Sequence, residues 1–111
     1  MIYLLDTNVA SELMKNHPRI VARLEALDDG DVAEVPIVAW LEAMSNIPVV
    51  GLKVEAARHF GSLLSHKKCR RLRRPDMLIA CIALANRAVL VTRNVKDFAN
   101  VPGLTLQNWF E

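Results

Sequence analysis

Aromatic residues are scarce in this chain of 111 residues, at 5% of the total, although hydrophobic residues make up 52%. A core with few rings must be built mainly from Leu, Val, Ile and Ala, which suits helices packed on a sheet. The length is typical of one domain, and the sequence has no internal repeat, low-complexity tract or flexible linker. We therefore expect a single domain over residues 1–111.

Long apolar runs are also missing. No segment approaches the roughly 18 apolar residues of a membrane span, and the apolar N-terminus is interrupted at Asp6 and lacks a basic leader. The two cysteines, Cys69 and Cys81, do not have the spacing of metal ligands, which suits reduced thiols in a cytosolic protein. The sequence therefore predicts a cytoplasmic protein with no membrane segment.

The formal net charge is only +2, which is too small by itself to indicate nucleic-acid binding. The basic residues are unevenly placed, because six of the 14 lie in a basic segment, residues 67–74: Lys67, Lys68, Arg70, Arg71, Arg73 and Arg74. As a charge run alone, this basic segment slightly favours a solvated helix end or loop over a phosphate-binding strip. No aromatic residue interleaves it, so base stacking is not supported.

Short apolar strands alternate with helices along the chain. The first strand, "IYLL", shows no polar alternation, which is typical of a parallel sheet buried on both faces. Further strands are expected at residues 32–35, 88–92 and within 102–109, and helices at 7–14, 18–27, 36–44, 53–64 and 74–86, with one helical turn within 94–101. This order predicts an α/β fold with a mostly parallel sheet flanked by helices.

Four carboxylates gain meaning from this topology. Asp6 and Asp97 follow predicted strands, whereas Glu42 and Asp76 lie on helices that would flank the same edge of the sheet. Each has a simpler alternative. Asp6 and Asp76 can cap helices, Glu42 can lie on a solvated helix face, and a turn can explain Asp97. Ligands of open parallel sheets, however, bind outside the carboxyl ends of the strands.

Carboxylates gathered at one edge repel one another, by roughly 3 kcal/mol for two that lie about 5 Å apart at an effective dielectric of about 20. A Mg²⁺ or Mn²⁺ ion removes this conflict because it prefers oxygen ligands. Such an ion can orient a phosphodiester and help to deprotonate an attacking water. The four acids therefore predict metal-dependent hydrolysis of phosphodiester bonds.

Three stretches, "IYLLDTNVASELM", "DMLIACIALAN" and "VLVTRNVKDFANVPGLTL", resemble the conserved blocks of VapC-type PIN-domain ribonuclease toxins. The resemblance implies a three-layer PIN-like domain with an acidic Mg²⁺ or Mn²⁺ site that cleaves RNA. It implies that Asp6 and Asp76 bind the metal and that Glu42 and Asp97 complete the catalytic acids. The supporting polar residues implied by the resemblance are Thr7, Asn8 and Asn94.

The same resemblance implies three partners: an RNA substrate, a VapB-type antitoxin whose C-terminal tail blocks the acidic site, and a second copy of the chain in a homodimer. Beside an acidic nuclease site, RNA contact becomes the better interpretation of the basic segment. A phosphatase of the haloacid dehalogenase type is disfavoured, because it would need a second aspartate where Asn8 stands. A receiver domain is disfavoured because it would need paired N-terminal acids.

The chain is shorter than typical members of that family. After Glu42, the stretch "SNIPVVGLKVEAARHF" leads almost directly into the next predicted helix, so we expect this chain to lack the helical hairpin that often helps to grip the antitoxin in that family. This departure leaves a second hypothesis open, a degenerate PIN domain that binds RNA or an antitoxin without cleaving. Retention of all four acids argues against it.

Overall fold

The computed structural model describes residues 1–36, 49–50, 54–66 and 72–111. Its centre is a sheet of five strands, namely β1 (Ile2–Leu5), β2 (Val32–Pro36), β3 (Val49–Val50), β4 (Val89–Val91) and β5 (Thr105–Gln107). The strands lie in the order β3-β2-β1-β4-β5, and every neighbouring pair is parallel. The predicted parallel α/β architecture is therefore confirmed, with β1 in the middle.

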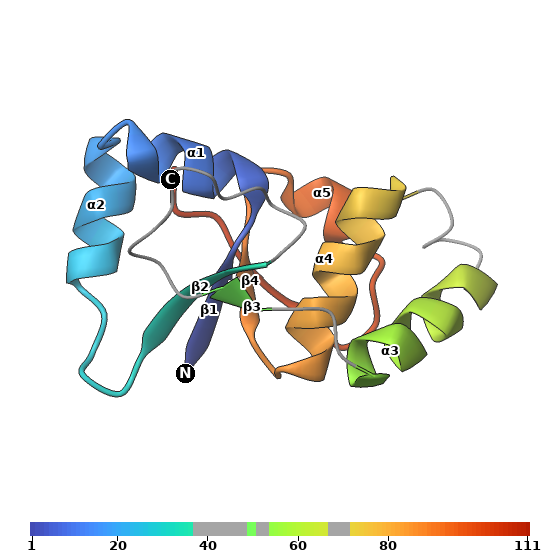
Figure 1. The fold of residues 1–111 in the computed structure, drawn as a ribbon. Coiled ribbons are helices and arrows are strands. Elements are labelled where there is room, and N and C mark those ends of the chain that lie inside the picture. The colour runs from blue at the N-terminus through green and yellow to red at the C-terminus, as the bar shows by residue number, and fades with distance from the viewer. Residues whose placement is uncertain (37–48, 51–53, 67–71) are drawn as a thin grey trace.

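Five helices are described around this sheet: α1 (Thr7–Met14), α2 (Pro18–Glu25), α3 (Val54–Ser65), α4 (Arg74–Ala85) and α5 (Val95–Phe98). In Figure 1, α1 and α2 lie on one side of the sheet, whereas α3 and α4 lie on the other. α2 begins with Pro18, whose fixed φ suits the first helical position, and the His17 Nδ1 atom accepts a hydrogen bond from the Arg19 backbone N–H at 3.3 Å.

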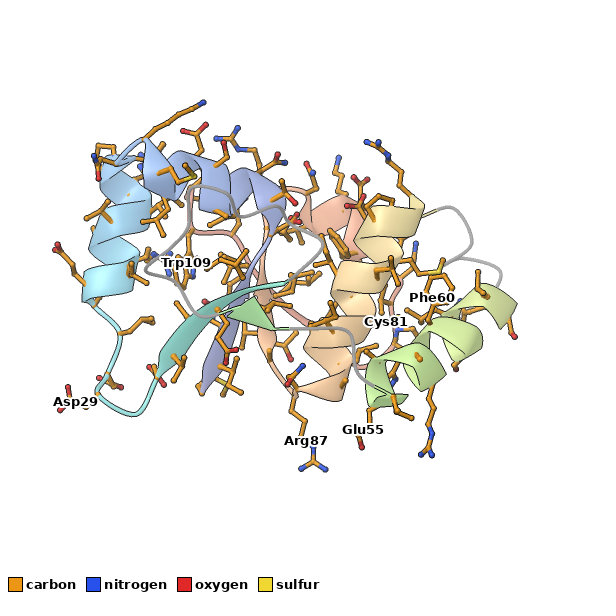
Figure 2. The ribbon with its side chains drawn as sticks, viewed as in Figure 1. Asp29, Glu55, Phe60, Cys81, Arg87 and Trp109 are labelled. Atoms are coloured by element: carbon orange, nitrogen blue, oxygen red, sulfur yellow. The ribbon has the colours of Figure 1, made fainter. Side chains whose placement is uncertain are left out.

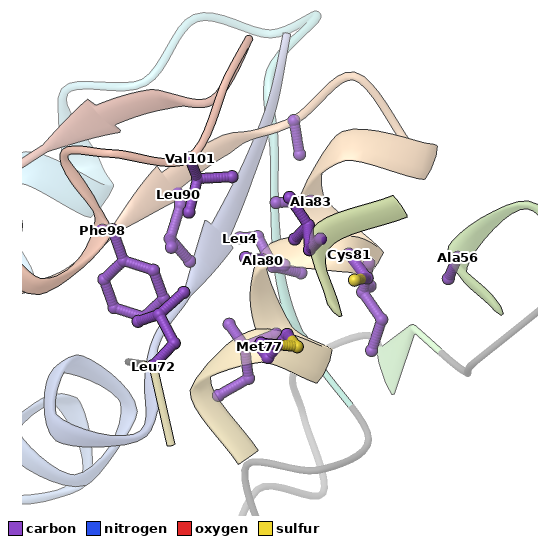
Figure 3. Close-up of a cluster of buried hydrophobic side chains, with 14 residues drawn as sticks. Leu4, Ala56, Leu72, Met77, Ala80, Cys81, Ala83, Leu90, Phe98 and Val101 are labelled. Carbon is purple, nitrogen blue, oxygen red and sulfur yellow. The ribbon is translucent and has the colours of Figure 1, made fainter. Parts of the chain in front are cut away.

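Successive residues of a strand point to opposite faces, which gives the sheet two cores. Leu4 and Leu90 belong to the core on the α4 side, and their neighbours Leu5 and Val91 belong to the core on the α1 side. Figure 3 shows the first core, to which α4 contributes Met77, Ala80, Cys81 and Ala83, and α5 contributes Phe98. The second core contains Val9, Ile20 and Trp109. The three-layer arrangement is confirmed.

α4 is apolar on every face, which predicts a helix buried between a sheet and another helix. The structure confirms this, because Ile79 to Ala83 are all buried and α3 packs against α4 on the side away from the sheet. Trp109 is also a core residue, with 1% of its surface exposed. Its indole N–H donates to Gln107 Oε1 at 3.0 Å, and Figure 2 shows the ring between the sheet and α2.

One expectation about the elements was wrong, and one strand was missed. Pro36 does not open a helix, because it is the last residue of β2 and pairs in register with Val50. The Val49–Val50 strand was not predicted, because two apolar residues between Pro48 and Gly51 look like part of a loop. The rest of the helix expected over 36–44 lies outside the described residues. No helix in the described ranges is long and apolar enough to cross a membrane.

Candidate functional site

Asp6 lies where β1 meets α1. Its backbone N–H donates to the Val91 carbonyl at 2.8 Å, so pairing with β4 continues one residue past β1. The side chain is only 3% exposed, and its Oδ1 atom accepts the Thr7 backbone N–H at 2.8 Å, which caps α1. The capping interpretation of Asp6 is therefore right. It does not exclude a ligand role, because a carboxylate offers about four acceptor positions.

Thr92 fixes the second oxygen of this carboxylate. Its hydroxyl donates to Asp6 Oδ2 at 2.8 Å and accepts the Asn94 backbone N–H at 3.0 Å, and the residue is fully buried. Since an ionised carboxylate can only accept hydrogen bonds, the hydroxyl proton must point to Asp6. Thr92 thus joins β1 to the turn that leads into α5. Sequence reasoning missed this residue.

Asp76 lies in the first turn of α4, and several effects shift its pKa. Partial burial raises the pKa most, and the negative charge of Asp6 raises it further. The Arg73 guanidinium lowers the pKa in part, and Asp97 adds a further raising effect. These interactions bring Asp6, Asp76 and Asp97 into one electrostatic neighbourhood, and Figure 1 shows α5, which carries Asp97, beside the start of α4.

The other predicted site residues are distributed around this acidic edge. Thr7 and Asn8 are exposed in the first turn of α1, and Asn94 is exposed just before α5. Arg73 is exposed and directly precedes α4. Arg74 opens α4, but its side chain lies outside the described part. The remaining predicted residues also lie outside it: Glu42, Lys67, Lys68, Arg70 and Arg71.

The chemistry of this edge suits a divalent cation. In the described part of the chain, no salt bridge within 4 Å involves Asp6, Asp76 or Asp97. Burial raises the pKa of Asp76 most, and the charges of Asp6 and Asp97 raise it further, although Arg73 opposes them. No three His, Cys, Asp or Glu side chains among the described residues form a group that could hold an ion. Of the charged groups that act on Asp76, Asp6 has the largest effect on its pKa, and Asp97 has a smaller one.

The chain is similar to bacterial ribonucleases named VapC over nearly its whole length. It is 32% identical to ribonuclease VapC1 of Haemophilus influenzae strain R2866 and 26% identical to ribonuclease VapC2 of Rickettsia felis, with 98% of each chain covered in both comparisons. Each alignment extends over 132 positions, more than the 111 residues present here, so these relatives carry residues that this chain lacks. No family model matches the chain.

Solved structures give the same result for the fold. VapBC-1 from nontypeable Haemophilus influenzae aligns with a TM-score of 0.88 at 29% identity, covering 100% of both chains. VapBC2 from Rickettsia felis, bound to a DNA fragment from its promoter, aligns with a TM-score of 0.86 at 24% identity, covering 98% of this chain and 99% of that chain.

A parallel sheet between two helical layers, with acids gathered at its carboxyl edge, defines an α/β domain of the PIN type. Within that class, the identity to VapC1 over nearly the full length of both chains decides the family. The chain belongs to the VapC ribonuclease family.

Proposed function

We propose that this protein is a metal-dependent endoribonuclease that hydrolyses RNA phosphodiester bonds and acts as the toxin of a toxin–antitoxin pair. The observation that carries the proposal is the proximity of Asp6 and Asp97 to Asp76 at one sheet edge, where burial raises the pKa of Asp76 most and the charges of the other two acids raise it further. A carboxylate whose pKa is shifted by burial and by neighbouring charges is a candidate functional group. Relatives named ribonuclease support the choice of RNA as the substrate.

Asp6 and Asp76 would hold Mg²⁺ or Mn²⁺, with Asp97 and the predicted acid Glu42 completing the catalytic set. A bound ion would supply a Lewis acid that orients the phosphodiester and promotes deprotonation of the attacking water. The chain's own contribution is preorganisation: Thr7 and Thr92 each fix one oxygen of the Asp6 carboxylate. Because Asp6 is 3% exposed, its orientation is set by the protein and not by solvent.

Partners follow from the same family. Structures of relatives are VapBC complexes, some of them with DNA, which supports a VapB-type antitoxin as the partner here. We also propose a homodimer and a cytoplasmic location, where RNA substrates are found. In the basic segment, Arg73 is exposed beside Asp76 and acts on its pKa, so it is placed to meet a phosphate near the acids.

The test is cleavage of a mixed structured RNA by the wild type, Asp76→Asn and Asp6→Asn, each with Mn²⁺ and with excess chelator. Circular dichroism controls for folding, which is needed most for Asp6→Asn because Asp6 caps α1. We expect Mn²⁺-dependent cleavage by the wild type, and at least a hundredfold lower rate in both variants, as for loss of one charge-stabilising group (roughly 10²–10³).

A second outcome would favour the degenerate PIN domain. If the wild type binds RNA but does not cleave it in Mn²⁺, the residues that this chain lacks relative to VapC1 become the leading explanation. Cleavage that persists in chelator, or in both variants, would contradict the proposed role of the acids.

A further inference from the structure

A groove lined by several polar and charged side chains lies beside Asp97. It has a volume of about 490 Å³ and runs between α5 and the C-terminal residues. Its lining includes Arg93, Asn94, Lys96, Asp97, Asn108 and Glu111. A hollow of this size can take a group as large as a nucleotide. No role has been assigned to it so far.

Arg93 is held in a defined position at this groove. Its guanidinium carbon lies 3.8 Å from the centre of the Phe110 ring. A guanidinium stacked on a ring keeps its N–H edge available, and that edge matches the geometry of a phosphate. Arg93 is exposed, so its charge faces solvent, and the contact with the Phe110 ring restricts the position of the guanidinium.

The ring under Arg93 is itself anchored. The Phe110 backbone N–H donates to Asn108 Oδ1 at 2.9 Å, and its carbonyl accepts the Arg19 guanidinium at 2.6 Å. The His17 ring meets the Phe110 ring nearly edge-on, with 5.2 Å between the ring centres. Contacts from α2 and from the C-terminal residues thus hold the ring in place. Arg93 is therefore preorganised.

The groove is continuous with the acidic edge. Asp97 lines the groove and also acts on the pKa of Asp76, and the Asn94 backbone is bonded to Thr92, which holds Asp6. Arg93 and Lys96 are the two cations of the lining, and Asp97 and Glu111 are its two acids. Arg93 and Lys96 are both exposed, so their charges are available to a phosphate that enters the groove.

We propose that this groove is a second phosphate-binding subsite of the nuclease, in which Arg93 and Lys96 hold the RNA backbone one or more nucleotides away from the bond that is cut. The inference rests on the proposed RNA cleavage, since an RNA strand lying on the acids must continue to one side or the other. Phosphate contacts of this kind fix the position of the strand without reading its sequence.

Binding of a labelled, short single-stranded RNA of mixed sequence tests this subsite. The parent protein is Asp76→Asn in Mn²⁺, which keeps the RNA intact. It is compared with four double variants, in which Asp76→Asn is combined with Arg93→Ala, Arg93→Lys, Lys96→Ala or Arg87→Ala. Arg87 is the matched control, because it is an exposed cation at the opposite end of α4 from Asp76 (Figure 2). Anisotropy at several salt concentrations gives the dissociation constant and its salt dependence.

We expect Arg93→Ala and Lys96→Ala each to weaken binding about three- to tenfold and to reduce the slope of log K against log salt by about 0.7, the value for one phosphate contact to a single strand. Arg93→Lys should keep the slope because it keeps the charge. Arg87→Ala should leave both quantities unchanged.

Affinities and slopes that match the parent in both groove variants would overturn the subsite while leaving the nuclease proposal intact. A parent that does not bind RNA would overturn the subsite too, and wild-type cleavage then decides the nuclease proposal separately. An equal loss in Arg87→Ala would mean that overall charge, and not the groove, attracts RNA, and would also overturn the subsite.

Discussion

At the scale of single residues, the Thr92 hydroxyl decides how Asp6 faces the site. It satisfies two partners at once, the Asp6 carboxylate and the Asn94 backbone N–H, in a position that solvent does not reach. A buried polar group that loses its partner bears the full cost of its desolvation. The stability of the protein and the orientation of the acid should therefore depend on the same hydroxyl.

Replacing Thr92 by Val keeps the shape of the side chain but removes this hydroxyl. We expect the free energy of unfolding to fall by about 1–3 kcal/mol, because the Asn94 N–H and one Asp6 oxygen lose their partner. RNA cleavage should fall at least tenfold in protein that is still folded. Urea denaturation and the cleavage assay measure the two effects.

Thr92→Ser is the matched control, because it retains the hydroxyl. It should recover most of the cleavage rate and most of the stability. If Thr92→Val cleaves RNA at the wild-type rate, Thr92 does not position Asp6.

The pKa of Asp76 gives the metal-free protein a defined pH dependence. Burial and the neighbouring acids raise this pKa above its usual value of 3.8, so the folded state holds the proton more tightly than the unfolded state. Between 3.8 and the raised pKa, stability therefore falls as pH rises, and the loss persists at neutral pH.

Asp76→Asn removes the carboxylate whose ionisation lowers the stability of the folded state. In chelator, the variant should be more stable than the wild type at pH 7, and the difference should shrink as the pH is lowered toward 4. Thermal denaturation across this range provides the measurement. A variant that is less stable than the wild type at pH 7 would show that the ionised Asp76 is stabilised in the fold.

Much of the acidic site could be predicted at this scale, but Thr92 could not. Asp6, Asp76 and Asp97 stand at strand ends and helix starts, where topology alone makes acids informative. Thr92 looks like the last residue of an apolar strand, and Thr is common in strands. Its distinguishing feature is the hydrogen bond to Asp6, which lies 86 residues away in the chain. That contact depends on the pairing of β4 with β1, which Thr92 itself does not reveal.

At the scale of elements, α4 links the core to the site. Its first turn carries Asp76, and its remaining turns are buried between the sheet and α3. Packing along α4 therefore fixes where Asp76 lies relative to Asp6. A defect in the middle of this helix should cost stability first.

Ile82→Ala tests this packing, since Ile82 is fully buried in the core that contains Leu4 and Leu90. We expect the variant to lose about 2–5 kcal/mol of stability through the cavity that it creates. Val54→Ala is the control, because Val54 is 70% exposed at the start of α3, and it should change stability by less than about 0.5 kcal/mol. Equal effects in urea denaturation would contradict the packing described for α4.

The elements that could be predicted are those with a local signal. The all-apolar character of α4 and the unbroken "IYLL" strand are both readable without tertiary contacts. β3 is different, because its two residues become a strand only through pairing with Val35 and Pro36 of β2. The extent of β2 depends on the same pairing, which is why Pro36 was wrongly expected to begin a helix.

At the scale of the whole molecule, the parallel sheet gathers acids that are far apart in the chain. Asp6 directly follows β1, Asp76 lies in the first turn of α4 and Asp97 lies in α5. All three reach the carboxyl edge because the strands of the sheet run in the same direction. The groove beside Asp97 extends this edge toward the C-terminal residues, so metal and RNA contacts would share one face. The central claim is that this edge is a divalent-ion site.

Calorimetric titration of Mn²⁺ into metal-free protein tests that claim most directly, with the wild type compared with folded Asp76→Asn. We expect at least one Mn²⁺ bound per wild-type chain and at least tenfold weaker binding in the variant, since one of the two proposed ligand carboxylates is lost. Equal binding by both proteins, or no binding by the wild type, would show that these acids do not form a divalent-ion site.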